Sequence, residues 1–166
     1  MTAHLTFDVV VEVPQGSRNK YETDPDTGEL RLDRVLFPAV RYPAEYGYVV
    51  DTLAGDCDPL DALVIVDEPT FPGCRIDCRA IGLLRMRDQH GRDVKVLALP
   101  TFDTSRRWKD VGDVPEDRLR EIHHFFDIYK DLDRDAFTHV EGWSGRAKAE
   151  QEIVSVRKRY LRSRSM

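Results

Sequence analysis

The hydrophobic periodicity of this chain changes from two residues to about 3.6 residues two-thirds of the way along its length. In the segment FDVVVEV (7–13), Val9, Val11 and Val13 lie on one face, which is the alternation of a half-buried strand. An Asp-Pro-Asp-Thr-Gly turn divides residues 20–34 into a predicted hairpin. The remaining strand candidates are 46–53, 61–66, 75–86 and 94–99.

Two later segments carry apolar residues at helical spacing, and they predict two C-terminal helices. In 115–132 these residues are Leu119, Ile122, Phe126 and Tyr129. In 144–164 they are Ile153, Val156 and Tyr160. Strands followed by helices indicate an α+β, mainly β fold, and favour a small barrel with the helices packed outside. Because no repeat or linker interrupts the pattern, we expect a single domain over residues 1–166.

Composition and charge narrow the class of protein. The 166 residues are 41% hydrophobic and 33% charged, which is typical of a globular domain. A net charge of −5 disfavours nucleic acid and membranes as partners, but allows an anionic substrate if cations reverse the local field. The N-terminal residues lack the pattern of a signal peptide, and no apolar run approaches a membrane span of about 20 residues. A cytoplasmic location is therefore expected.

Three cysteines, Cys57, Cys74 and Cys78, suit reduced thiols, because an odd number leaves no paired framework. Zinc is the alternative for Cys74 and Cys78. We disfavour it because four strand positions separate two sulfurs by about 13 Å, which is too far for one ion.

The densest charge lies in GDCDPLDALV (55–64), where Asp56, Asp58 and Asp61 precede an apolar strand candidate. These like charges repel one another unless cations offset them. A calcium-binding EF-hand is excluded, because its fifth position is Leu60, its sixth is not glycine and its twelfth is not glutamate. An Asp-rich turn by itself is more often an ordinary surface turn.

Further carboxylates lie at Glu12 in the first strand and at Asp88 and Asp93 in a turn between two strand candidates. An all-oxygen donor set suits Mg²⁺ or Mn²⁺ better than zinc or copper. Other charged and phenolic residues lie between these clusters: Lys20, Glu22, Arg34, Tyr42, Tyr46, Lys95, Tyr129 and Lys130. Each of them alone is more often a packed or surface residue. Together, cations and phenols beside clustered carboxylates favour phosphoryl chemistry.

In order along the chain, these pieces resemble the family I soluble inorganic pyrophosphatases. The most specific element is the Asp-x-Asp-Pro-x-Asp stretch 56–61 followed by ALV. Supporting it are VEVP, KYE, YPAEYGY, GRDVK and HFFDIYKDL, so the similarity extends from about Phe7 to Trp143. The segment PQGSRNKYE (14–22) is most similar to the actinobacterial branch of that family.

This resemblance implies an OB-type, five-stranded β-barrel with flanking strands, usually assembled as a homo-hexamer. It implies hydrolysis of inorganic diphosphate to two orthophosphates, dependent on several Mg²⁺ ions, with Mn²⁺ or Zn²⁺ as substitutes. Two other functions remain open on the residues alone. One is an OB-fold module that binds single-stranded nucleic acid, and the other is a degenerate pyrophosphatase with a weakened metal site.

The resemblance also implies roles for individual residues. The metal ligands would be Asp56, Asp61, Asp88, Asp93, Glu12 and Glu22. Asp58 would orient and deprotonate the attacking water, with Tyr46 contacting the same region. The substrate-binding residues would be Lys20, Arg34, Tyr46, Lys95, Tyr129 and Lys130, and Tyr42 would belong to the wall of the site.

Two positions depart from the family pattern. Gln89 replaces a glutamate that usually follows the first aspartate of the turn, so the last metal ion is expected to bind more weakly. Cys57 replaces a glycine. If this position requires a positive φ, a Cβ there costs about 1 kcal/mol or more. His90 lies in the same turn as Gln89, and we expect it to be exposed.

Overall fold

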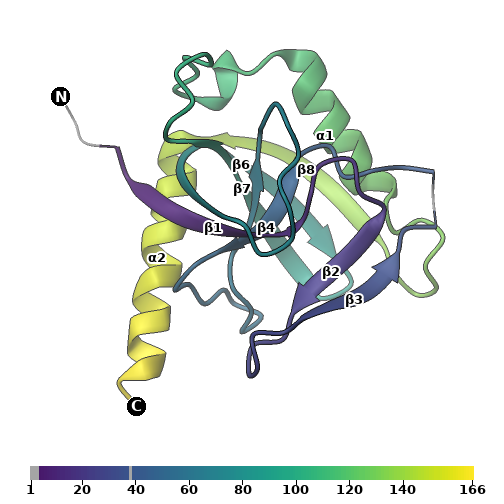
Figure 1. The fold of residues 1–166 in the computed structure, drawn as a ribbon, viewed down its shortest axis with the longest axis horizontal. Helices are drawn as coiled ribbons and strands as arrows, with labels where there is room; N and C mark the ends of the chain where they lie inside the picture. The colour runs from purple at the N-terminus through teal and green to yellow at the C-terminus, as the bar shows by residue number, and fades with distance from the viewer. Residues whose placement is uncertain (1–3, 38) are drawn as a thin grey trace.

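Five strands close into a ring in the computed structural model, which describes residues 4–37 and 39–166. Figure 1 shows the arrangement of these elements. Around the ring, each strand pairs with the next: β1 (Thr6–Val13), β4 (Glu45–Val49), β5 (Asp61–Val64), β7 (Gly91–Pro100) and β6 (Arg75–Asp88). Pairing of β6 back to β1 completes the closure. All pairs are antiparallel except β5 with β7. The predicted OB-type barrel is confirmed.

Flanking elements cover the barrel. A separate two-stranded sheet consists of β2 (Asn19–Thr23) and β3 (Leu30–Val35), the predicted hairpin. Both predicted helices are confirmed, as α1 (Glu116–Ile128) and α2 (Arg146–Arg164), and a short 3-10 helix, η1 (Val111–Asp113), precedes α1. Across the described ranges, no helix combines the length and apolar character needed to cross a membrane.

Apart from strand ends that differ by up to three residues, two features depart from the sequence-based expectation. The strand β8 (Thr138–Gly145), which pairs with β6, was not predicted, because Val140 is its only buried residue. Its last two residues also fall within the segment predicted as a helix from residue 144. The strand expected over 46–53 ends at Val49, since the chain turns at Asp51, whose φ is 58°.

Two apolar clusters form the core on opposite faces of the strands. Along β5, Leu63 joins the cluster that contains Phe125 and Phe126 of α1, whereas Ala62 and Val64 join the cluster that contains α2. This division follows from the alternation of side chains along a strand. On β7, Leu97 belongs to the α1 side. Asp61 lies two residues before Leu63, and Lys95 and Asp93 lie two and four residues before Leu97. Their side chains therefore lie on the side of the barrel that α1 covers.

Gly47 allows β4 to approach β1 closely. A Cβ at this position would lie 1.9 Å from the carbonyl oxygen of Val10, a separation that real Cβ atoms do not show. Glycine is therefore required by the packing of the backbone, and the neighbouring Tyr46 can reach its buried place next to α1.

Candidate active site

The parallel register of β5 and β7 places Asp61 directly opposite Lys95. Asp93 lies two residues before Lys95 on the same face of β7. The Lys95 ammonium donates hydrogen bonds to Asp61 (2.9 Å), Asp93 (3.2 Å) and the Tyr46 hydroxyl (3.1 Å). The Lys95 side chain is only 1% exposed. A buried cation thus holds two of the predicted metal ligands and one predicted catalytic residue together.

Burial and neighbouring charges act against each other at this pair. Burial raises the pKa of Asp61, Lys95 opposes that shift, and Asp93 adds to it. Burial alone would lower the pKa of Lys95, but Asp61, Tyr46 and Asp93 outweigh it, and the net shift is upward. Lys95 is consequently a permanent positive charge at neutral pH.

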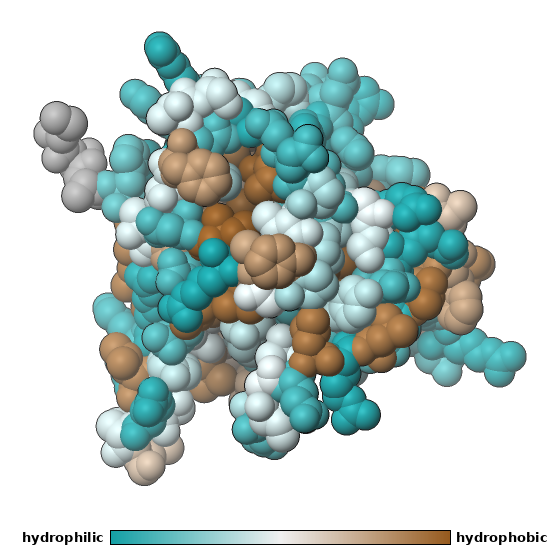
Figure 2. All heavy atoms as spheres, viewed as in Figure 1, coloured by the Kyte–Doolittle hydropathy of each residue, from teal (hydrophilic) through white to brown (hydrophobic). Residues whose placement is uncertain are grey.

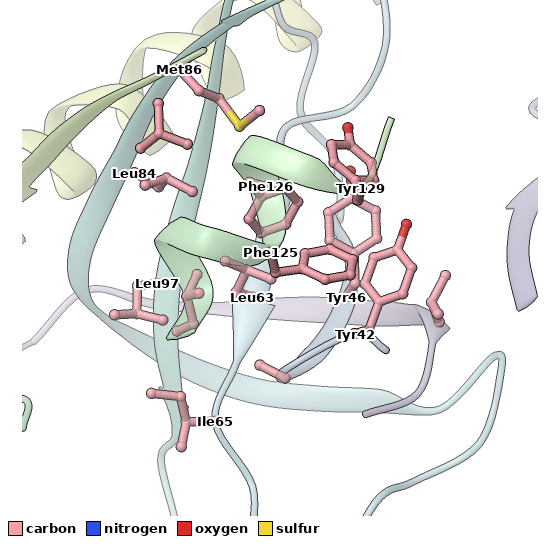
Figure 3. Packing of buried hydrophobic residues seen from close by; sticks show 14 of the residues in the cluster. Tyr42, Tyr46, Leu63, Ile65, Leu84, Met86, Leu97, Phe125, Phe126 and Tyr129 are labelled. Carbon is pink, nitrogen blue, oxygen red and sulfur yellow. The ribbon is translucent and has the colours of Figure 1, made fainter. Parts of the chain in front are cut away.

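Aromatic side chains pack together next to Lys95, and Figure 3 shows Tyr42, Tyr46, Phe125, Phe126 and Tyr129 in this cluster. The ring of Phe125 lies 4.7 Å from that of Tyr42 and stacks on Tyr129 at 5.3 Å, measured between centroids. The Lys95 nitrogen lies 5.1 Å from the centroid of Tyr46 and 5.4 Å from that of Phe126. Burial raises the pKa of Tyr129 to about 12, so its phenol stays neutral and can donate a hydrogen bond.

The turn before β5 carries Asp56, Cys57 and Asp58 on an exposed loop. The Asp58 amide donates to the Asp56 carboxylate at 3.0 Å. Cys57 has a φ of 68°, so the position requires the left-handed conformation that favours glycine. Partial burial raises the pKa of Asp58, and the charges of Asp56, Asp61 and Glu22 raise it further. Asp58 is therefore more basic than an ordinary aspartate.

The turn between β6 and β7 brings Asp88 to the other side of the site. Its carboxylate accepts from the His90 amide at 2.8 Å and lies 3.7 Å from the Lys130 ammonium. Burial lowers the pKa of Lys130, and Asp88 partly opposes that shift. Gln89 and His90 are exposed at the tip of this turn, as expected for His90.

The β2–β3 hairpin contributes further predicted site residues. Thr23 at the end of β2 donates from its amide to Glu12 at 2.7 Å, which ties the hairpin to β1. Burial raises the pKa of Glu12 to about 7 in spite of that hydrogen bond. Lys20 and Arg34 are paired across the hairpin, and the Lys20 ammonium lies 2.9 Å from Glu22.

Comparison with known proteins assigns this arrangement to a family. The family model described as inorganic pyrophosphatase matches residues 9–161. The chain belongs to the inorganic pyrophosphatase family. An inorganic pyrophosphatase of Streptomyces coelicolor is 53% identical over 158 residues, covering 94% of this chain and 96% of the relative. The crystal structure of an inorganic pyrophosphatase from Thermus thermophilus superposes with a TM-score of 0.93 at 43% identity, covering 97% of this chain and 94% of that chain.

The donor set of this pyrophosphatase is chemically suited to a divalent cation. Within residues 4–37 and 39–166, no three acidic, histidine or cysteine side chains are close enough to form a preassembled site for one ion. Lys95 instead separates Asp61 from Asp93. The raised pKa values of Glu12, Asp58 and Asp61 arise from burial and mutual repulsion, both of which a bound cation would offset. The donor set therefore fits a hard divalent ion.

Sequence reasoning missed two acidic residues of this pyrophosphatase that pair with predicted substrate-binding cations. Asp33 lies 3.5 Å from the Lys20 ammonium. Asp133, in the loop after α1, accepts a hydrogen bond from Arg34. Asp33 directly precedes Arg34 in the sequence, but that dipeptide does not indicate which cation the carboxylate pairs with, and the acidic stretch around Asp133 is indistinguishable in sequence from a solvated loop.

Proposed function

We propose that this protein hydrolyses inorganic diphosphate to two orthophosphates with Mg²⁺ as its divalent ion, acting as a single domain over residues 1–166. The supporting observation is the buried Lys95 ammonium, which donates hydrogen bonds to Asp61 and Asp93. Diphosphate is a polyanion, so a site that binds it must supply positive charge without repelling its oxygens. Membership of the inorganic pyrophosphatase family supports the same substrate.

Each carboxylate has a proposed place in this chemistry. The residues that would hold metal ions are Asp56, Asp61, Asp88, Asp93, Glu12 and Glu22. When bound, such ions supply charge that stabilises phosphate oxygens and acidifies a nearby water. Asp58 is exposed and more basic than usual, so it can accept the proton of the attacking water. The Tyr46 hydroxyl, fixed by Lys95, borders the same region.

The cations and phenols would bind the phosphate groups. Lys95 lies on β7, and Lys20 and Arg34 lie on the β2–β3 hairpin. Tyr129 and Lys130 directly follow α1. Carboxylates paired with the three lysines keep these ammonium groups in place before the substrate arrives, so less side-chain entropy is lost on binding. Tyr42 packs against Phe125 and supports this wall.

The alternative functions lack support. A single-stranded nucleic acid would meet Asp56, Asp58 and Glu22 at the mouth of the site, and these carboxylates repel a phosphate backbone. A degenerate pyrophosphatase would be expected to lose ligands, whereas all six carboxylates that the resemblance assigns to metal ions are present in this chain.

Assembly as a homo-hexamer in the cytoplasm completes the proposal. The surface bears large apolar side chains among hydrophilic ones (Figure 2). Phe71 and Phe102 are 63% and 77% exposed in the single chain. Subunit contacts that cover such residues would remove apolar area from water.

A phosphate-release assay with diphosphate and Mg²⁺, Mn²⁺ or Zn²⁺ tests the activity and the metal preference together. We expect activity with Mg²⁺ and its loss in chelator. Asp58→Asn and Asp61→Asn should each lower kcat at least 100-fold, on the order of one essential catalytic group. Glu68→Gln is the matched control, because Glu68 is an exposed carboxylate that follows the end of β5 opposite to Asp61. Full activity of both aspartate variants would refute the mechanism.

A further inference from the structure

Arg34 makes a long-range ion pair that none of the roles assigned above explains. Its Nη1 donates to the carboxylate of Asp133, which lies 99 residues further along the chain. The Arg34 side chain is 30% exposed and that of Asp133 is 17% exposed, so the pair is partly shielded from water. The contact joins the β2–β3 hairpin to the loop between α1 and β8.

The guanidinium retains donors that Asp133 does not use. Its Nε is buried and, within the described residues, has no hydrogen-bond partner. The nearest carboxylate oxygen, from Asp33, is 3.8 Å away, beyond hydrogen-bond distance. A buried donor without an acceptor is costly, and a guanidinium can present two donors in parallel to a phosphate. Among the described residues, Nη1 is the only guanidinium nitrogen of Arg34 that makes a hydrogen bond, and the side chain is 30% exposed, so donors remain for the oxygens of a ligand.

Asp133 is well placed to hold the guanidinium because its own loop is pinned to α1. The Asp133 amide donates to the Lys130 carbonyl at 2.9 Å, which forms a tight turn directly after the proposed phosphate-binding residues. At the far end of the loop, the Thr138 hydroxyl donates to the Phe126 carbonyl at 2.6 Å. The Val140 amide donates to the Asp127 carboxylate at 3.1 Å.

We infer that Asp133 is a positioning residue that orients Arg34 so that its free donors face the diphosphate. This inference rests on the proposed function. It differs from a simple electrostatic role, because a carboxylate near an anionic substrate weakens binding through charge alone. Removing the charge of Asp133 should therefore tighten binding if the residue only repels substrate, and weaken binding if it positions Arg34.

Steady-state kinetics of Asp133→Asn with diphosphate and Mg²⁺ separates the two roles. We expect KM to rise about tenfold, since a hydrogen bond between charged groups has an effect of at least that size, with kcat within about threefold of the wild type. Asp131→Asn is the matched control, because it removes the same charge from an exposed position in the same loop. Its KM should equal or fall below that of the wild type. Asp133→Glu keeps the carboxylate and should stay within about threefold of the wild-type KM.

A double-mutant cycle shows whether the effect passes through Arg34. In an Arg34→Ala background, Asp133→Asn should cause no further rise in KM. An unchanged or lower KM in Asp133→Asn would overturn the inference, as would a Glu variant that behaves like the Asn variant, or a full additive effect in the Arg34→Ala background. Wild-type protein without phosphate release would instead refute the proposed function, so the two failures are distinct.

Discussion

Replacing Gly47 with alanine tests whether close backbone approach holds the barrel and its site together. The new Cβ would lie 1.9 Å from the Val10 carbonyl oxygen and 2.8 Å from the Val10 carbonyl carbon. Both atoms belong to backbone, so no side chain can rotate away, and β1 and β4 must separate by about 1 Å merely to reach 3.0 Å, the shortest separation that real Cβ atoms show. Overpacking of this kind costs about 3 kcal/mol, the upper part of the usual range.

The expected loss corresponds to a fall in Tm of about 6–12 °C for a chain of this length. Urea unfolding at one fixed protein concentration measures the free energy directly and avoids differences in assembly. Gly112→Ala is the matched control. Its Cβ meets no described atom within 4 Å, so its free energy of unfolding should change by less than about 0.5 kcal/mol.

Because Gly47 is adjacent to Tyr46, the same substitution should also disturb the hydrogen bond between Tyr46 and Lys95. We expect a rise in KM together with the loss of stability. A Gly47→Ala protein that unfolds within about 0.5 kcal/mol of the wild type would refute the claim that glycine is required there.

Other measurements test separate features. Although partial burial acts in the opposite direction, hydrogen bonds from Arg106 lower the pKa of Asp103 to about 2. A depressed pKa contributes stability above the unfolded value of about 4, which is lost as pH falls toward 2. The wild type should therefore exceed Asp103→Asn by about 1–2 kcal/mol in urea unfolding at pH 7 and by clearly less at pH 3, and a constant gap would contradict the reasoning. In native protein, iodoacetamide should label the exposed Cys57 well before Cys78, because Cys78 is buried and that burial raises the pKa of its thiol. Peptide mapping by mass spectrometry measures the order of labelling, and equal rates at the two cysteines would contradict this prediction. Gln89→Glu should lower the Mg²⁺ concentration for half-maximal activity by about threefold to tenfold, because it adds a charge beside Asp88, and an unchanged titration would show that this position does not affect the ions.

Hydrophobic periodicity along the sequence was enough to predict much of the barrel and both helices. The alternation in 7–13 predicted β1, with Val9, Val11 and Val13 buried as expected. Helical spacing predicted α1 and α2 to within a few residues at most ends. These strands and helices could be predicted because each repeats one hydrophobic period over several residues. The strand β8 has one buried residue in eight, so its sequence carries no such period.

The order of short motifs in the sequence also predicted which residues belong to the site. It did not predict which of these charged residues form ion pairs with one another. Lys95 lies between Asp61 and Asp93 because the parallel register of β5 and β7 aligns them. Arg34 meets Asp133 because the hairpin and the loop after α1 fold to the same end of the barrel. The sequence thus determined which charges are present, and the tertiary structure decided which neutralise one another. The physical reason is that Coulomb energy depends on separation in space and on burial, and neither is set by distance along the chain.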